Sequence, residues 1–469
     1  MSEAFFTYMK FELMLVIIIF ILLFLKIWKN KLNNKTVLQV ANVLLLVNFV
    51  VGFFGNVAGE LFADMFRTTE LIVLEKNILN LGALVISLQA YNWLLNHKHA
   101  PEFYIILLSS LMGMFFMISS QNIFMFYLGL ELSTIPLAAL VNFDLEKRKS
   151  GEAALKYIIS SAFSSGMLLF GISLLYGALG TLNFAEISVV MNAEPLLIFS
   201  FILLFAGFAF KISAVPFHLW TADVYEGAPV PITSYLSVIS KGAIIFVFVS
   251  VLYSAFQNIF TIWYNLLFLI SVATMLIGNL FAIRQQNLKR FLAFSSIAQV
   301  GFILIGISGN SAEGTASAIY FILVYLFSNL GAFGVVALVS AATGKENMDD
   351  YKGFYKTNPM LAWVLTISLF SLAGIPPTAG FFGKFFLLMA GAGQGNNVLI
   401  IIAALNMIIS LYYYLKIVKA MFMDTNDNPI QKLETGLHPK FAFIICITGI
   451  VVTGLAGGCY EYIYSLIQV

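Results

Sequence analysis

Residues 373–380 read Ala-Gly-Ile-Pro-Pro-Thr-Ala-Gly and interrupt an apolar run that extends from residue 359 to residue 390. A straight helix of about 32 residues would be roughly 48 Å long, well beyond the roughly 30 Å of a bilayer's hydrocarbon core. The two prolines remove backbone donors and the glycines permit a non-helical turn. Freed backbone groups are tolerated at membrane depth only where they face protein or water. The stretch therefore predicts a broken transmembrane helix beside a hydrated interior.

The composition extends this prediction to the whole chain. Of the 469 residues, 60% are hydrophobic and only 10% are charged, whereas soluble globular proteins average about 25% charged residues. Apolar runs near the roughly 20 residues needed to span a bilayer recur along the whole length. We therefore predict an all-α polytopic membrane protein with a single membrane domain, residues 1–469. The net charge of +2 is too small to indicate nucleic-acid binding.

The apolar runs and the basic residues between them predict the topology. Fourteen spans are expected, at about residues 11–28, 37–54, 71–95, 103–118, 122–143, 154–180, 195–220, 230–254, 260–283, 290–308, 316–341, 359–390, 398–423 and 440–465. Cytoplasmic loops hold the excess of Lys and Arg. With the N-terminus outside, eighteen basic residues, Lys29 and Lys31 among them, fall on the inner side, and only Lys10 and Arg67 fall on the outer side. An even number of spans then places both termini on the outer side of the membrane.

The spans can be grouped into two corresponding sets of five, residues 103–254 and 260–423. In each set the fourth span is interrupted and carries a lysine, and the first interruption lies at Pro216, five residues after Lys211. Because five is odd, the second set must enter the membrane with the opposite topology, which is the inverted repeat common in transporters. The flanking helices lie in residues 1–95 and 440–465.

Five basic residues remain inside the spans, namely Lys76, Lys156, Lys211, Lys241 and Lys384. A charge at mid-bilayer costs roughly 2.5–3.5 kcal/mol even on a lenient scale, and four lysines about 10 kcal/mol, which argues against incidental placement. A lysine in water has a pKa near 10.4, which burial and neighbouring charges change, so a buried lysine can act as a switchable proton carrier. The alternative is that the side chain extends to the membrane interface. This alternative applies best to Lys156, which lies near the end of a span.

Glu131 lies near the middle of the fifth span with no other charge close in sequence, so it needs a partner. One interpretation is a structural ion pair with a lysine that only fixes helix packing, since buried pairs occur without function. The other is an acid whose attraction regulates how tightly Lys211 holds its proton.

For several other polar residues the sequence allows both a structural and a functional role. Lys76, with Glu75 beside it, is a candidate for a local structural pair. His218, Asp223 and Glu226 follow the first break, where a helix-end role and a role in proton uptake are both open. A path between the last two lysines would need polar side chains, and those available on the tenth and eleventh spans are Ser295, Ser296, Gln299, Tyr320, Ser328 and Asn329.

Motifs for redox cofactors and metals are not found. The run Gly-Ala-Gly-Gln-Gly at residues 391–395 lacks the third glycine of a dinucleotide fingerprint and follows an apolar helix. Cys446 and Cys459 are thirteen residues apart, without the paired close spacing of zinc or iron–sulfur ligands. We expect this chain to bind no cofactor and no metal.

Residues 211–241 read Lys-Ile-Ser-Ala-Val-Pro-Phe-His-Leu-Trp-Thr-Ala-Asp-Val-Tyr-Glu-Gly-Ala-Pro-Val-Pro-Ile-Thr-Ser-Tyr-Leu-Ser-Val-Ile-Ser-Lys. This stretch resembles the signature of the subunit N family of bacterial respiratory complex I (NADH–quinone oxidoreductase), one of its antiporter-like membrane subunits. Further matches surround Glu131 and cover residues 152–157, 288–301 and 374–384. The M-type relatives carry Glu where this chain has Lys384, and the L-type relatives have a long lateral helix that 469 residues cannot accommodate.

The resemblance implies a function for the buried charges. Glu131, Lys211, Lys241 and Lys384 would form a hydrated chain for proton transfer, with Lys156 as an additional member. Electrons would pass from NADH to quinone through FMN and iron–sulfur clusters in other membrane and peripheral subunits of the complex, and that energy would drive proton transfer here.

One residue departs from the family pattern, and two other functions compete. The family often has His where this chain has Gln299; Gln cannot take up a proton at neutral pH, so we expect it to organise water. A subunit of a multisubunit sodium–proton antiporter would share much of the lysine pattern. A structural membrane scaffold would use the buried charges only to hold helices together.

Overall fold

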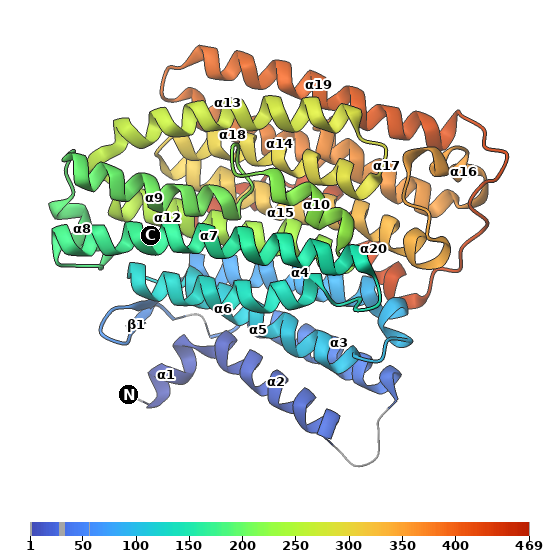
Figure 1. Ribbon diagram of the computed structural model, residues 1–469, viewed down its shortest axis with the longest axis horizontal. Coiled ribbons are helices and arrows are strands. Elements are labelled where there is room, and N and C mark those ends of the chain that lie inside the picture. Colours follow the sequence, from blue (N-terminus) through green and yellow to red (C-terminus); the bar gives the residue numbers. More distant parts are fainter. Residues whose placement is uncertain (1, 28–32, 56, 469) are drawn as a thin grey trace. The chain divides into compact units, whose positions relative to one another are not determined.

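The computed structural model describes residues 2–27, 33–55 and 57–468; Lys29 and Lys31 lie outside these ranges. Helices account for nearly all regular structure there (Figure 1). The strands found among these residues are β1 (Gly59–Leu61) and β2 (Phe66–Thr68), which pair antiparallel with Glu60 opposite Arg67. The prediction of an all-α polytopic fold is therefore confirmed, with an additional short hairpin that the sequence did not predict.

The chain folds into two compact units. The first unit comprises Met1–Leu84, Asn92–Ile212 and Ile239–Trp263, and the second comprises Val85–Tyr91, Ser213–Val238 and Tyr264–Val469. The chain leaves the first unit directly after Ile212, at the first helix break. The division into repeats at residues 103–254 and 260–423 stays a prediction.

The first unit contains the N-terminal helices, the hairpin and the helices up to the first break. Its helices are α1 (Ser2–Tyr8), α2 (Lys10–Ile27), α3 (Asn34–Val51), most of α4 (Glu70–Leu95), α5 (Ala100–Ile118), α6 (Ile123–Val141), α7 (Arg148–Leu179), α8 (Phe184–Val190), α9 (Pro195–Lys211), α12 (Lys241–Ala255) and the short 3₁₀ turn Gln257–Ile259.

The second unit contains the segment after the first break and the C-terminal helices. Its helices are α10 (Leu219–Gly227), α11 (Val230–Tyr235), most of α13 (Phe260–Arg284), α14 (Leu288–Ser308), α15 (Ala312–Thr343), the 3₁₀ turn Met348–Tyr351, α16 (Phe354–Thr357), α17 (Pro359–Ala373), α18 (Ala379–Ala392), α19 (Asn397–Phe422), α20 (Leu437–Leu455) and α21 (Gly458–Gln468).

Helix ends follow from local sequence chemistry. The Thr69 hydroxyl accepts a hydrogen bond from the Ile72 N–H and starts α4, and the Asn287 side chain accepts from the Lys289 and Arg290 N–H groups and starts α14. These caps satisfy backbone donors that the first turn of a helix leaves free. Gly180 ends α7 with φ +72°, a conformation that glycine adopts without steric cost.

The expected spans correspond well to the observed helices. Eleven helices built from described residues are long and apolar enough to cross a membrane. The remaining three expected spans are α2, which carries Lys10, Glu12 and Lys26, and the two predicted broken helices. The breaks are confirmed between α9 and α10 and between α17 and α18. The last expected span is also interrupted, between α20 and α21, where the glycine-rich residues 454–458 disfavour a continuous helix.

Close helix packing positions the sites within each unit. In the first unit α5 lies along α6 and α7 along α9 (Figure 1). A Cβ at Gly113 of α5 would lie 2.4 Å from the Ser133 N of α6, so these two backbones approach more closely than a side chain allows. In the second unit α14 is buried along its whole length except at Arg290, and α15 packs against α17, α18 and α20.

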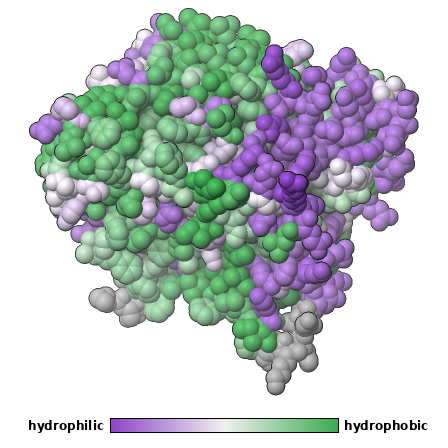
Figure 2. Space-filling model, in the orientation of Figure 1, coloured by the Kyte–Doolittle hydropathy of each residue, from purple (hydrophilic) through white to green (hydrophobic). Residues whose placement is uncertain are grey.

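The surface is that of a lipid-embedded protein. Figure 2 shows apolar residues over broad areas of one face, and hydrophilic residues gathered over α16 and the connections next to it. Large apolar side chains such as Phe163, Val189 and Leu219 are more than 70% exposed. Exposed apolar area of this extent indicates contact with lipid or other subunits.

Candidate functional site

Lys211 is the last residue of α9, directly before the first break. Its side chain is 8% exposed, and its Nζ donates hydrogen bonds to Thr134 Oγ1 at 2.9 Å and Ser161 Oγ at 2.7 Å. These hydroxyls belong to α6 and α7, which pack together, and α7 packs against α9. Three helices thus hold one ammonium group inside the first unit. The carbonyl-rich end of α9 also favours a positive charge at this position.

Glu131 lies one turn before Thr134 on α6 and is half-buried. Its charge acts on the Lys211 ammonium, yet no ion pair joins the two residues in the described part of the chain. The Glu131 Oε1 atom is buried and accepts no hydrogen bond from any described residue. The expected ion pair between Glu131 and Lys211 is therefore not formed among the described residues, and hydroxyl groups hold the lysine instead of the carboxylate.

Lys241 begins α12, also in the first unit, and is 2% exposed. The turn before it, Leu236–Ser240, is π-helical. Turns of this kind are rare and occur frequently at functional sites, because they change the direction in which the next side chain points. The sequence did not predict this turn.

Lys156 differs from the other candidates. Its side chain is 43% exposed and its Nζ lies 2.8 Å from Glu152 Oε1, one turn earlier on α7. The structure therefore places Lys156 at the surface of the first unit, whereas Lys211 and Lys241 are inside it.

Lys384 lies in α18 of the second unit and is fully buried. Its Nζ donates to the carbonyl oxygens of Leu372 at 2.8 Å and Ala373 at 3.2 Å, and lies 4.8 Å from the Phe302 ring centroid. The two carbonyls end α17, whose C-cap is Gly374 with φ +86°. A cation at a helix C-terminus is stabilised by the helix dipole and by the free carbonyls. The second break therefore forms a binding site for the ammonium group.

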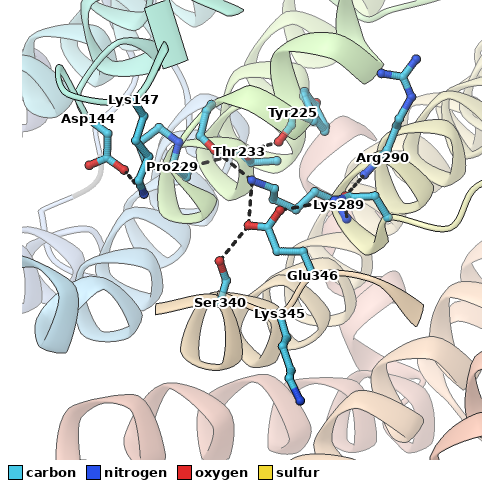
Figure 3. Close-up of polar contacts among 12 residues, drawn as sticks. Asp144, Lys147, Tyr225, Pro229, Thr233, Lys289, Arg290, Ser340, Lys345 and Glu346 are labelled. Carbon is cyan, nitrogen blue, oxygen red and sulfur yellow. Dashed lines mark hydrogen bonds and ion pairs between the residues drawn. The ribbon is translucent and has the colours of Figure 1, made fainter. Parts of the chain in front are cut away.

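A charged cluster lies at the beginning of α14, in the same unit. Figure 3 shows Glu346 between Lys289 and Ser340: Lys289 Nζ lies 3.0 Å from Glu346 Oε1, and the Ser340 hydroxyl donates to the same oxygen at 2.7 Å. Burial alone would raise the pKa of Glu346, but the Lys289 charge and hydrogen bonds from Ser340, Lys289 and Asn287 outweigh it and hold this pKa below its usual value.

The arrangement of charges does not indicate metal chemistry. No group of three or more His, Cys, Asp or Glu side chains suited to a metal occurs in residues 2–27, 33–55 and 57–468. The groups that hold the ammonium groups of Lys211 and Lys384 are hydroxyls and backbone carbonyls, which accept hydrogen bonds from a cation or from water.

A family model described as "NADH:quinone oxidoreductase/Mrp antiporter, TM" matches residues 120–410. The chain belongs to this family. Curated relatives named NADH-quinone oxidoreductase subunit N agree with this result. One from Azobacteroides pseudotrichonymphae is 47% identical over 94% of this chain and 92% of its own length, and one from Phocaeicola vulgatus is 44% identical over 97% of both.

Solved structures share the fold of this family member. A chain of respiratory complex I from Thermus thermophilus with bound aureothin superposes with a TM-score of 0.81 at 24% identity, over 96% of this chain and 97% of that chain. A chain of the Mrp complex from Dietzia sp. superposes with a TM-score of 0.87 at 19% identity, over 100% of this chain and 97% of that chain. At these identities the likeness concerns the fold alone.

All five predicted site residues lie within the part of the chain that the family model matches, whereas the buried Lys76 lies outside it. Lys76 Nζ lies 2.5 Å from Glu12 Oε1 of α2, and both side chains are almost fully buried. The sequence suggested a local pair with Glu75, whereas the structure pairs Lys76 with Glu12, 64 residues away in the chain. Neighbouring residues on a helix point in different directions, so Glu75 is less well placed to meet Lys76.

The charged residues after the first break are held at the helix surface in this family member. Arg290 Nη1 lies 2.7 Å from Asp223 Oδ1 and 3.0 Å from Glu226 Oε2, and all three are partly exposed. These contacts join α10 to α14, which supports the helix-end interpretation of Asp223 and Glu226. His218 precedes α10 and is buried.

The polar residues predicted for a path occupy several places in the second unit. Asn329 Nδ2 donates to Ser237 Oγ at 3.2 Å, and the Ser328 hydroxyl donates to Ser371 Oγ at 2.7 Å. Tyr320 donates to the Thr453 carbonyl, which is a packing bond between helices.

Sequence reasoning missed several residues that contact the predicted ones. Thr134 lies on the same helix face as Glu131, three residues later, and this spacing was a usable signal. Ser161 on α7 and Tyr414 on α19 had no such signal, because only tertiary packing brings them to Lys211 and Gln299.

Proposed function

We propose that this chain is a proton-translocating membrane subunit of an NADH–quinone oxidoreductase. Electron transfer from NADH to quinone in other membrane and peripheral subunits drives proton movement through this one. The relatives that are 47% and 44% identical over nearly the whole chain carry the name of that complex's subunit N. In this proposal NADH, FMN, the iron–sulfur clusters and quinone belong to the partner subunits.

The observation that carries the proton-transfer proposal is the environment of Lys211. Its ammonium is buried and held by two hydroxyl groups, while Glu131 lies near with a buried oxygen to which no described residue donates a hydrogen bond. A carboxylate stabilises an ammonium much more strongly in a buried site than in water. Movement of the lysine between the hydroxyls and Glu131 would therefore change how tightly it holds its proton.

Protons are then passed from Lys211 through Lys241 to Lys384. Each of these lysines is at least 92% buried. Buried ionisable groups at membrane depth are energetically costly, and those that are found there pair with other groups or have a function. Lys384 receives support from the carbonyls at the end of α17. Lys156 takes part as an additional member at the surface, where a partner subunit would shield its pair with Glu152.

We further propose an inner-membrane location with both termini on the outer side, and inverted repeats at residues 103–254 and 260–423. The orientation rests on the excess of basic residues assigned to the inner side. Support for the repeats comes from the two breaks, because each has a left-handed residue three positions before a proline. These residues are Ser213 and Pro216 in the first break, and Gly374 and Pro377 in the second.

Replacement of the buried lysines tests the proposal. Lys211→Ala or Lys241→Ala in the assembled complex should lower the number of protons moved per NADH oxidised in reconstituted vesicles. Lys356→Ala is the matched control, because Lys356 is an exposed lysine in the short helix α16. Normal proton movement by assembled Lys211→Ala and Lys241→Ala variants would contradict the proposal.

Two further experiments separate the competing functions. Co-purification with flavin- and iron–sulfur-containing subunits supports the oxidoreductase, whereas a complex without redox centres would indicate a sodium–proton antiporter. A purely structural role for the buried charges predicts normal proton movement after joint replacement of Glu131 and Lys211 by leucine.

A further inference from the structure

A chain of buried hydrogen bonds leads away from Lys384 in the second unit. The Lys384 ammonium donates to the Leu372 carbonyl at 2.8 Å, and Gln299 Nε2 donates to the same carbonyl at 2.9 Å. Gln299 Nε2 also donates to Tyr414 Oη at 3.1 Å, and this hydroxyl lies 2.5 Å from Ser295 Oγ. The contacts join α18, α17, α14 and α19 around one polar track.

The track is closed to the outside and contains an unsatisfied acceptor. The side chains of Lys384, Gln299, Tyr414 and Ser295 are all at least 98% buried. Gln299 Oε1 is buried and accepts no hydrogen bond from any described residue. An unsatisfied buried acceptor costs about 1–3 kcal/mol, and internal water commonly binds such atoms. The track is therefore suited to hold water between the lysine and the tyrosine.

The track runs towards the charged end of the second unit. Ser295 lies seven residues after the first residue of α14, which is about 10 Å along a helix. Lys289 and Glu346 form their ion pair at that end, where the Glu346 side chain is 23% exposed (Figure 3). Ser295 and Tyr414 thus lie between the fully buried lysine and a solvent-accessible charged group.

The chemistry of the track explains how protons can pass a glutamine. Gln299 cannot take up a proton at neutral pH, so it cannot itself relay one. A hydroxyl group can, because one O–H bond forms on the side that delivers the proton while the other breaks on the side that releases it. Tyr414 and Ser295 would both remain neutral before and after each transfer.

We propose that Tyr414 is a proton-relay residue that, together with Ser295, connects Lys384 to the end of the unit at which α14 begins. The inference rests on the proposed function, because it assigns a route to the same protons. Water at Gln299 Oε1 bridges Lys384 and the Tyr414 hydroxyl, and Gln299 positions both.

The substitution Tyr414→Phe tests the relay because it removes one oxygen atom and keeps the ring. The complete complex is reconstituted in vesicles, and the protons moved per NADH oxidised are measured. Tyr91→Phe is the matched control, because this tyrosine of the second unit is also buried and its ring stacks on that of His438. We expect fewer protons moved per NADH oxidised for Tyr414→Phe, unchanged electron transfer with an uncoupler present, and a normal proton ratio for Tyr91→Phe.

A rescue variant and a second relay variant make the test independent of whether Tyr414→Phe assembles. Gln299→His combined with Tyr414→Phe should recover part of the lost ratio, because an imidazole can carry a proton. If Tyr414→Phe does not assemble, Ser295→Ala replaces it, with Ser308→Ala as the control because that buried hydroxyl donates to the Ile305 carbonyl of its own helix. A normal ratio in the relay variants, or equal losses in relay and control variants, would overturn the inference.

The variants Lys384→Ala and Tyr414→Phe together distinguish an error in the relay from an error in the proposed function. Normal proton movement in Lys384→Ala would contradict the use of Lys384 itself, and with it this part of the proposed function. Impaired movement in Lys384→Ala with normal movement in Tyr414→Phe would remove only the relay.

Discussion

The hydroxyl groups around Lys211 lead to a specific prediction. Thr134 Oγ1 accepts a hydrogen bond from the Lys211 ammonium at 2.9 Å, and its own proton is donated to the Leu130 carbonyl at 2.7 Å. Thr134→Val keeps the branched shape and removes the acceptor. Of its two hydroxyl partners among the described residues, the lysine then keeps Ser161, while Glu131 stays available as a competing partner.

The size of the effect follows from the lost contact. A hydrogen bond to a charged group contributes about 1.5–3 kcal/mol, and each 1.4 kcal/mol changes an equilibrium about tenfold. Thr134→Val should therefore shift the balance about tenfold or more from the hydroxyl-bound lysine towards the lysine paired with Glu131. A proton held by that ion pair is released less readily, so fewer protons should move per NADH oxidised.

The assay compares two threonines that differ in one contact. Thr366 is also buried and donates its hydroxyl to the carbonyl four residues earlier, at 2.8 Å, as Thr134 does. Thr366→Val should therefore leave proton movement close to that of the unchanged complex. In a Glu131→Gln background, Thr134→Val should have a smaller effect, because the competing carboxylate is absent. Equal proton movement in Thr134→Val and the unchanged complex would refute the reasoning.

Three further changes test other parts of the structure. Gly374→Ala should destabilise the second break by about 1 kcal/mol or more, since φ is +86° there and the added Cβ would lie 3.2 Å from Lys384 Cδ; an unchanged Tm would contradict this. Glu12→Gln should destabilise by about 3–5 kcal/mol, whereas joint replacement of Glu12 and Lys76 by Leu and Met should be nearly neutral in thermal unfolding. The folded-state pKa of Glu346 is lowered, so its contribution to stability is full above the ordinary value of 4.5 and is lost as the pH falls through the lowered value. Acidification below pH 4.5 should thus reduce Tm more for the unchanged chain than for Glu346→Gln, and equal losses would count against the ion pair.

Features encoded by local sequence were predictable. The helix breaks at Pro216 and at Pro376-Pro377 follow from missing backbone donors, and the structure confirms both. The length of each apolar run likewise determined the number of spans, because a helix must cover the thickness of the bilayer.

Features that depend on packing between distant segments were not predictable. Lys76 meets Glu12, which is 64 residues away, and no sequence pattern indicates that α2 and α4 face each other at those positions. Tyr414 similarly meets Gln299 across 115 residues. The burial of Lys211, Lys241 and Lys384 agrees with the expectation from sequence, whereas Lys156 lies at the surface. The roles of all four in proton transfer stay predictions.

The contact between Lys384 and the last carbonyls of α17 links the protonation of this lysine to the movement of two half-helices. A charged side chain there tethers the end of one half-helix to the next, and discharge of that side chain weakens the tether. Each passage of a proton would loosen and retighten the hinge at Gly374. Hydrogen–deuterium exchange at residues 374–380 should then be faster in Lys384→Met than in the unchanged chain, and identical rates would disprove such a hinge.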